Sequence, residues 1–391
     1  MTRKIGAKVV MPVSGEPIRN GVVTFDEAGR VTAVSGENGF DPACPGDVEV
    51  YDGVLTPGFV NTHSHLELAY MAGVLPPGTG LAGFIKRVME SKFTFPEEVQ
   101  RKAIADADKH LWESGVQAVG DISNTTVSFE TKKNSPIKYV TYAEIFDFMA
   151  GMSTEAAMQQ GEEVVAQAER MGLEAYVTLH ATYSVSDKLF GAWHEMKHTG
   201  CLSIHYRESL ADDELFDRTG PFWDYFQEKG FELDFLNDGS STNRILRHIP
   251  ANRRVLLVHN SNVTASDIEQ MKAKYERLSW ALCPMSNLYI EGKLPPVELM
   301  SAYNLNLTIG TDSLSSNTDL SMVAEMRALA EGFNLPLPVV LRWATLNGAK
   351  ALEMDREIGS FEVGKTPGAV LIEGLDEALR FTPTTSSRRL I

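Results

Sequence analysis

The pattern of hydrophobic and polar positions changes near residue 55 and again near residue 355. Up to residue 55, short apolar runs alternate with turn residues, which predicts a small sheet with tight turns. These runs are Lys8–Val13, Gly21–Phe25 and Val31–Val34. After Leu352 the same pattern returns, with runs at Gly359–Val363, Gly368–Glu373 and Arg380–Thr382.

Between these ends, short apolar runs alternate with longer amphipathic segments, which is typical of repeated β–α units and a parallel sheet. Eight runs occur, at Gly58–Asn61, Val116–Ile122, Tyr139–Phe146, Ala175–Leu179, Cys201–Tyr206, Val255–Val258, Leu278–Leu282 and Leu305–Ile309. Helical spacing follows most of them, at Glu97–Glu113, Ser186–Lys197, Asp212–Glu228, Ala265–Tyr275, Leu320–Ala330 and Pro338–Leu352. Ser186 and Thr264 are predicted N-caps.

Eight units over about 300 residues predict an α/β fold of the (β/α)8 TIM-barrel type. A doubly wound open sheet would show the same alternation. We expect the barrel at residues 57–355, with residues 1–56 and 356–391 pairing as the N- and C-terminal parts of a small β-sandwich. Pairing of the C-terminal part is the least determined, because Pro367 has no N–H for an inner strand.

Composition narrows the classes of function. The 391 residues are 43% hydrophobic and 23% charged, as in soluble globular proteins, with no apolar run of membrane-spanning length. The net charge of −16 disfavours nucleic acid and anionic membranes as partners. Three scattered cysteines exclude a disulfide framework and fit a reducing cytoplasm. We expect a cytoplasmic protein with a small-molecule substrate, either monomeric or a homo-oligomer.

Histidines at the ends of the apolar runs are the main chemical signal. His63 and His65 follow the first run, and residues i and i+2 of a strand point to the same side. Both imidazoles can therefore face one metal ion. Later runs end in His180, His205 and His259, and Asp312 follows the eighth. Because barrel active sites form where the carboxyl ends of the strands meet, we expect one common site.

Taken in order, the segments resemble the amidohydrolase superfamily, in the subgroup of cytosine, guanine and S-adenosylhomocysteine deaminases and s-triazine chlorohydrolases. The resemblance covers nearly the whole chain. It is carried by Pro57–Leu66, His180–Ser186, His205–Glu208, Val258-His259, Cys283–Asn287 and Gly310–Ser313. Within the subgroup, His63–Leu68 with Gly80-Leu81 looks closest to aminodeoxyfutalosine deaminases.

The resemblance implies a site with one divalent ion, Zn²⁺ in the first place and Fe²⁺ as the alternative. The implied ligands are His63, His65, His205 and Asp312. Binuclear members have a carboxylated lysine at the end of the fourth strand, and His180 stands there instead, which favours a single ion.

The implied catalytic residues are Glu208, His259 and Asp312. Glu208 would shuttle protons, His259 would stabilise the developing charge, and Asp312 would take a proton from water. Glu67 and His180 would contact the substrate by resemblance. Arg207 could pair with a substrate carboxylate or balance nearby acids, and Ser316 lies in a candidate binding loop.

These expectations favour a hydrolase of non-peptide C–N bonds. A metal ion lowers the pKa of bound water so that it attacks as hydroxide at neutral pH. The substrate would be the exocyclic amine of an aromatic N-heterocycle, of the purine nucleoside kind, adenosine- or aminodeoxyfutalosine-like. One alternative is a dechlorinase or amidase of another cyclic substrate, which Glu208 disfavours. The other is a catalytically silent metal-binding barrel, which the filled catalytic positions disfavour.

One further motif has to be weighed. Gly78–Gly83 matches the Gly-x-Gly-x-x-Gly pattern of dinucleotide-binding proteins. Pro76 and Pro77 stand where the preceding strand should end, so we expect a flexible loop at the mouth of the site.

Overall fold

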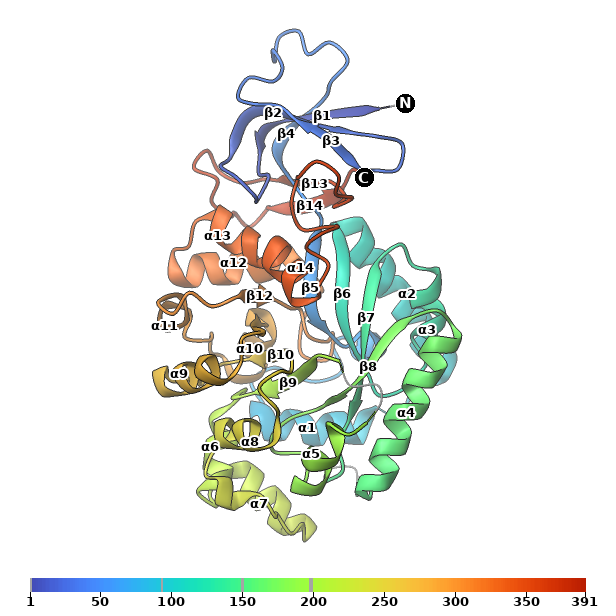
Figure 1. The fold of residues 1–391 in the computed structure, drawn as a ribbon, viewed down its shortest axis with the longest axis vertical. Helices are drawn as coiled ribbons and strands as arrows, with labels where there is room; N and C mark the ends of the chain where they lie inside the picture. The colour runs from blue at the N-terminus through green and yellow to red at the C-terminus, as the bar shows by residue number, and fades with distance from the viewer. Residues whose placement is uncertain (1, 93, 149–150, 197–199) are drawn as a thin grey trace.

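The computed structural model describes residues 2–92, 94–148, 151–196 and 200–391. The molecule has an α/β part built from parallel strands and helices, and a small sheet at one end (Figure 1). Among the described residues, no helix has the length and apolar character needed to cross a bilayer.

The small sheet contains strands from both ends of the chain, as expected. Its six strands are β1 (Arg3–Val10), β2 (Ile18–Phe25), β3 (Val31–Val34), β4 (Glu49–Thr56), β13 (Val370–Glu373) and β14 (Ser386–Arg389). Their order is β14-β13-β4-β1-β2-β3, and β13 pairs antiparallel with β4. Figure 1 shows the blue N-terminal and red C-terminal strands together at the top. The described residues give a single six-stranded sheet here.

Some terminal strands differ from the prediction. Gly359–Val363 and Arg380–Thr382 are not strands. Gly359 has a φ of 89°, which ends any extended run there, and the Asp376 carboxylate binds the N–H groups of Ala378 and Arg380 in a loop. β4 and β14 do not follow from the apolar runs, since each is half exposed and polar.

All eight predicted apolar runs of the central part are strands. They are β5 (Phe59–Ser64), β6 (Val116–Ser123), β7 (Lys138–Ile145), β8 (Glu174–Leu179), β9 (Leu202–Tyr206), β10 (Val255–His259), β11 (Leu278–Leu282) and β12 (Leu307–Ile309). They form two parallel sheets, β5-β6-β7-β8 and β9-β10-β11-β12. Single parallel bridges, Ala181↔His205 and Ser64↔Asp312, connect the chain after β8 with β9 and β5 with the chain after β12. The carboxyl ends of strands from both sheets are thereby adjacent.

Helices follow the strands largely as predicted. Their bounds are α1 (Gly80–Ser91), α2 (Glu97–Ser114), α3 (Phe129–Asn134), α4 (Thr154–Arg170), α5 (Asp187–Trp193), α6 (Leu210–Phe216), α7 (Gly220–Lys229), α8 (Ser241–His248), α9 (Ala265–Lys274), α10 (Pro284–Glu291), α11 (Val297–Ser301), α12 (Met322–Phe333), α13 (Leu337–Arg342) and α14 (Gly348–Ala351). Short 3-10 segments lie at η1 (Leu66–Met71) and η2 (Leu236–Asp238), and η3 (Trp343–Asn347) is a π-helical turn. The side chains of Ser186 and Thr264 cap α5 and α9, as predicted.

Two predictions, of one helix and of one loop, need correction, and a third extends beyond the described residues. The run Asp212–Glu228 is broken into α6 and α7, because Arg218 and Gly220 have φ values of 59° and 79°. The Gly78–Gly83 segment is not wholly a loop, since α1 begins at Gly80. Lys197, the end of the predicted Ser186–Lys197 helix, lies outside the described residues.

Candidate active site

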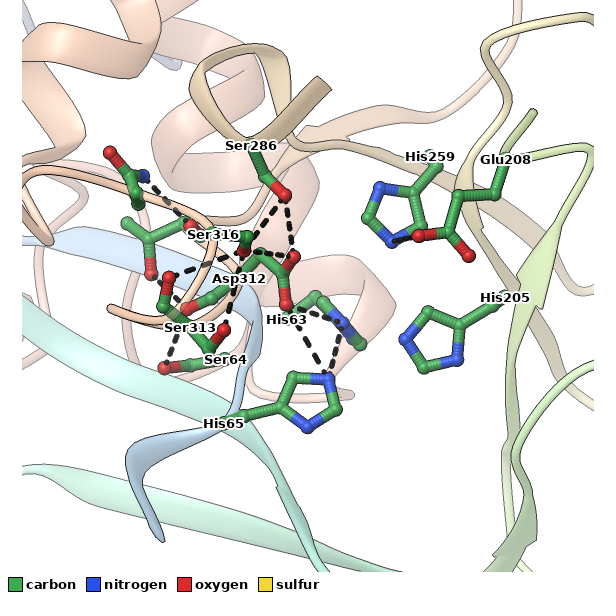
Figure 2. A network of polar contacts seen from close by, with 12 residues as sticks. His63, Ser64, His65, His205, Glu208, His259, Ser286, Asp312, Ser313 and Ser316 are labelled. Atoms are coloured by element: carbon green, nitrogen blue, oxygen red, sulfur yellow. Dashed lines mark hydrogen bonds and ion pairs between the residues drawn. The ribbon is translucent and has the colours of Figure 1, made fainter. Parts of the chain in front are cut away.

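Three histidines converge at the carboxyl ends of β5 and β9: His63 in β5, His65 directly after it, and His205 in β9 (Figure 2). The Nε2 atoms of His63 and His65 lie 3.1 Å apart. One ring nitrogen from each of His63, His65 and His205 lies within 4.8 Å of the others. The side chain of Asn61, also in β5, accepts the N–H of Thr311 at 3.1 Å and donates to its hydroxyl at 2.8 Å. This pair of bonds holds the chain after β12 against the histidine strand.

Asp312 completes this group from the chain after β12. Its Oδ1 lies 3.7 Å from Nε2 of His63 and 3.5 Å from Nε2 of His65. Its Oδ2 accepts hydrogen bonds from the hydroxyls of Ser286 (2.6 Å) and Ser316 (2.7 Å). Burial opposes ionisation, but His65, His259 and the two hydroxyls together lower the pKa of Asp312. The carboxylate is therefore fixed with one oxygen toward the histidines.

The neutral state of the three histidine rings suits a bound cation. Nδ1 of His205 lies 2.7 Å from the carbonyl oxygen of His180, and a carbonyl only accepts, so this nitrogen carries the hydrogen. Nε2 of neutral His205 therefore keeps its lone pair. Burial lowers the pKa of His205, that of His63 strongly, and that of His65 to about 4. Neutral imidazoles beside a buried carboxylate are a donor set for a divalent ion.

Glu208 and His259 lie beside this donor set. Oε1 of Glu208 is 3.5 Å from Nε2 of His259, and the hydroxyl of Tyr183 donates to Oε2 at 3.3 Å. Burial is the main cause that raises the pKa of Glu208 to about 7. A carboxyl group with this pKa both holds and releases a proton near neutral pH.

The ring of His259 is oriented by Asn287. Nδ1 of His259 lies 3.0 Å from Oδ1 of Asn287, whose own amide donates to the hydroxyl of Ser261 at 2.9 Å. The amide oxygen accepts, so Nδ1 carries the hydrogen and Nε2 is the free acceptor of the neutral ring. Burial lowers the pKa of His259.

Four of these residues, His65, His205, Glu208 and Asp312, open onto one cavity. Its walls are formed by His65, Leu68, Leu81, Phe84, Ile85, Val88, Met89, Lys92, Asn124, Glu144, Phe146, His180, Tyr183, His205, Glu208, Asp312, Ser313 and Ser315. Helix α1 contributes an apolar wall, so this segment is a structured part of the site. His180 faces the cavity, and its Nδ1 lies 2.7 Å from the hydroxyl of Ser184.

The other residues predicted to bind substrate are engaged within the protein. Both terminal nitrogens of Arg207 pair with the Asp213 carboxylate at 2.8 and 2.9 Å, so Arg207 balances nearby acids. Ser316 binds Asp312. The carboxylate of Glu67 accepts three hydrogen bonds, from the N–H of Asn124 and from the N–H and hydroxyl of Thr125, and holds this loop in place. Glu67 lines a neighbouring pocket, which shares Leu68, Lys92 and Asn124 with this cavity, so its contact with substrate stays a prediction.

Two buried acids near the site were missed by the sequence analysis. Glu144, at the end of β7, lines the cavity, and burial raises its pKa to about 8. Asp121, in β6, accepts the N–H of Leu66 at 2.8 Å, next to His65, and forms a fully buried ion pair with Lys132. Both acids interrupt apolar runs, and a lone carboxyl inside such a run is the signal that could have revealed them.

Glu144, His180 and His205 also lie close enough together to suggest a second cation site. His205 belongs to both groups, and its Nδ1 is held by the carbonyl oxygen of His180. Nδ1 of His205, the nitrogen 3.7 Å from Glu144, is therefore not available to a cation in this second group.

Comparison with known proteins gives consistent matches. The chain is 28% identical over 319 residues to an adenosine deaminase of Helicobacter pylori, covering 80% of this chain and 77% of that protein. It is 27% identical over 403 residues to a 5-methylthioadenosine/S-adenosylhomocysteine deaminase of Moorella thermoacetica, covering 93% and 84%. A crystal structure of Helicobacter pylori aminofutalosine deaminase in complex with methylthio-coformycin matches with a TM-score of 0.82 and 26% identity, covering 97% and 93%.

The family comparison extends over most of the chain. The model of the amidohydrolase family matches residues 54–389. This range includes every residue of the histidine, aspartate and glutamate group described above. The chain therefore belongs to the amidohydrolase family.

Proposed function

We propose that the chain is a metal-dependent hydrolytic deaminase of a purine nucleoside. The observation that carries this proposal is the position of Glu208, a carboxyl group with a pKa near neutrality, beside His259 and the His63–His65–His205–Asp312 donor set. A deaminase needs an acid at this place, because the amine leaves readily only when it is protonated. The relatives named above are deaminases of adenosine, methylthioadenosine or aminofutalosine, which supports the same class of substrate.

We propose that His63, His65, His205 and Asp312 hold one divalent ion, Zn²⁺ in the first place and Fe²⁺ as the alternative, since both accept nitrogen and oxygen ligands. When bound, the ion supplies Lewis acidity that makes water nucleophilic at neutral pH. Oδ1 of Asp312 and Nε2 of His259 are the acceptors available for the proton of that water. Once protonated, His259 donates from Nε2 and stabilises the negative charge that develops on the substrate.

Glu208 provides the second proton transfer in this proposal. It protonates the ring nitrogen beside the attacked carbon, and this proton stays there as the N–H of the product. Glu208 then carries the proton of the added hydroxyl group to the leaving amine. A C–O bond forms, the C–N bond breaks, and ammonia leaves while the ring becomes a lactam. Tyr183 holds Oε2 of Glu208 at 3.3 Å, which keeps the carboxyl oriented at the cavity wall.

We also infer that the two parallel sheets are halves of one closed (β/α)8 barrel over residues 57–355. The bridges Ala181↔His205 and Ser64↔Asp312 support this closure. Residues 1–56 and 356–391 form the small β domain in this proposal, and its β-sandwich form stays a prediction. The sequence composition supports a cytoplasmic location without nucleic-acid or membrane partners.

The proposed function is tested by ammonia release from adenosine, 5′-deoxyadenosine, methylthioadenosine, adenine, guanine and amino- and chloro-triazines. We expect release from at least one purine nucleoside, its loss after chelation, and its recovery with Zn²⁺ or Fe²⁺. The variant Glu208→Gln should lose most of its activity while retaining metal, and the exposed variant Glu228→Gln serves as the matched control. Chloride release from triazines without deamination of nucleosides would favour the dechlorinase alternative, and metal binding without turnover would favour a silent barrel.

A further inference from the structure

Glu144 presents a buried oxygen to the cavity that nothing in the proposed chemistry uses. Its side chain is 3% exposed and lies at the end of β7, on the cavity wall. Oε2 accepts a hydrogen bond from Nδ2 of Asn124 at 3.1 Å. Oε1 has no hydrogen-bond partner among the described residues. Buried polar atoms are nearly always hydrogen-bonded, so an orphaned oxygen on a cavity wall indicates a ligand group that binds there.

The neighbouring groups do not account for this oxygen. Nδ1 of His205 is 3.7 Å from Oε1, but it already donates to the carbonyl oxygen of His180 at 2.7 Å. Nδ2 of Asn124 is shared between Oε2 of Glu144 and the Glu144 carbonyl oxygen, both at 3.1 Å. Glu144 is therefore held in place through one oxygen while the other remains available.

The cavity has three chemically different parts. The reacting groups His65, His205, Glu208 and Asp312 form the first part. The apolar side chains of α1 form the second, and Glu144, Asn124 and Lys92 form a further polar part, which adjoins the first because Oε1 of Glu144 lies 3.7 Å from Nδ1 of His205. A purine nucleoside has the same three parts, namely a reacting base edge, a flat ring system and a hydroxylated sugar.

Hydrogen-bond chemistry favours the sugar over the base as the partner of Glu144. The base of an adenine nucleoside has one N–H-bearing group, the amine that reacts, and that group must face Glu208 and the metal ligands. Its ring nitrogens only accept, so they pair with Oε1 only when Glu144 is protonated. The ribose offers hydroxyls, which pair with a carboxyl oxygen whether that oxygen donates or accepts.

We propose that Oε1 of Glu144 hydrogen-bonds a hydroxyl group of the ribose, so that the site selects ribonucleosides over free bases and over one deoxynucleoside. This inference rests on the proposed function. Glu144 acts here as a specificity-determining residue, and Asn124, itself held by Glu67, orients it.

The test compares adenosine with its 2′-, 3′- and 5′-deoxy analogues in the metal-loaded enzyme. The wild type should use one of the three analogues about 10- to 100-fold less efficiently than adenosine, as expected for one lost hydrogen bond to a carboxyl group. In Glu144→Met, kcat/KM for adenosine should fall by a similar factor, and that for the discriminated analogue by less than about threefold. Asn124 keeps the Glu144 carbonyl oxygen as its acceptor in this variant, and metal content should be unchanged.

Each result decides the question. A wild type that uses adenosine and all three analogues equally overturns the role of Glu144 without any variant, and leaves the proposed function intact. Equal losses on all four substrates in Glu144→Met, or loss of metal, would make Glu144 a structural residue and also overturn the inference. Release of ammonia from bases but from no nucleoside, or from no compound at all, overturns the inference together with the proposed nucleoside substrate.

Discussion

The hydroxyl of Ser316 donates to Oδ2 of Asp312 at 2.7 Å, and this contact leaves Oδ1 to face His63 and His65. Ser286 binds the same oxygen and also Ser316, at 2.9 Å, so the two hydroxyls act together. Asp312 has a φ of 56°, a conformation that few residues other than glycine adopt. The turn and the two serines together determine where the carboxylate points.

Loss of the Ser316 hydroxyl should weaken metal binding rather than abolish it. We expect Ser316→Ala to reduce the affinity for Zn²⁺ by about tenfold, because second-layer partners of metal ligands contribute about 10- to 100-fold and Ser286 remains. Competition titration against a chromophoric chelator measures the affinity. The exposed variant Ser14→Ala should bind as the wild type does, and an unchanged affinity in Ser316→Ala would contradict the orienting role.

Activity should fall on the alkaline side. Glu208, whose pKa burial raises to about 7, must be protonated to deliver its proton, and the protonated fraction falls tenfold per pH unit above its pKa. A bound cation favours the carboxylate, so the alkaline limb of kcat/KM should have an apparent pKa of about 7 or lower. A profile that stays flat between about pH 6 and 9 would argue against Glu208 as the acid.

Glu208→Gln should reduce kcat by about 10²- to 10⁴-fold.

The orientation of His259 depends on Asn287. In Asn287→Leu, Nδ1 of His259 loses its acceptor at 3.0 Å, and the ring can present either nitrogen to the substrate. We expect kcat to fall by about 10- to 100-fold with little change in KM, as for other groups that fix the tautomer of a functional histidine. Steady-state kinetics with metal analysis tests this, and a lower metal content would instead point to a general disturbance of the site.

The buried pair of Asp121 and Lys132 should be important for stability. Both side chains are fully buried, their charged atoms lie 2.6 Å apart, and Lys132 also donates to the hydroxyls of Ser123 and Thr141. Lys132→Met leaves an uncompensated buried carboxylate and should reduce the free energy of unfolding by about 3–5 kcal/mol. Urea unfolding measures this, with the exposed neighbour Lys133→Met as control. Adding Asp121→Asn should restore part of the loss; without any recovery, Lys132 would matter through its packing instead.

The sequence predicted the strand ends well because the chemistry of the site lies at regular places in a repeated pattern. His63, His65, His205, Glu208, His259 and Asp312 all lie together as expected. The direction of the Glu67 side chain could not be predicted in this way. Its position next to the histidine strand was evident, but its direction depends on the loop at Asn124 and Thr125, which is distant in sequence. The left-handed backbone at His259 and Asp312, with φ values of 72° and 56°, likewise has no sequence signal comparable to a glycine.

The edges of the fold were harder to predict for a related reason. β4 and β14 are partly exposed, so their pattern of apolar residues is weak, and each becomes a strand through the partner beside it. Helix α1 begins in a Gly- and Pro-rich segment, where the N–H of Leu81 binds the side chain of Glu291 at 2.7 Å. The two residues are more than two hundred positions apart, so the pattern of residues around α1 could not predict this contact.

The pairing of β4 with both β1 and β13 has a consequence for how the protein is made. A ribosome releases β1 to β4 first, yet β13, which pairs with β4, follows only after the whole central part of the chain. During translation the outer edge of β4 therefore remains open to unwanted pairing, a hazard that grows with the delay before closure. Chains truncated before residue 370 would keep that edge open permanently, and we expect them to be found among aggregated or degraded material.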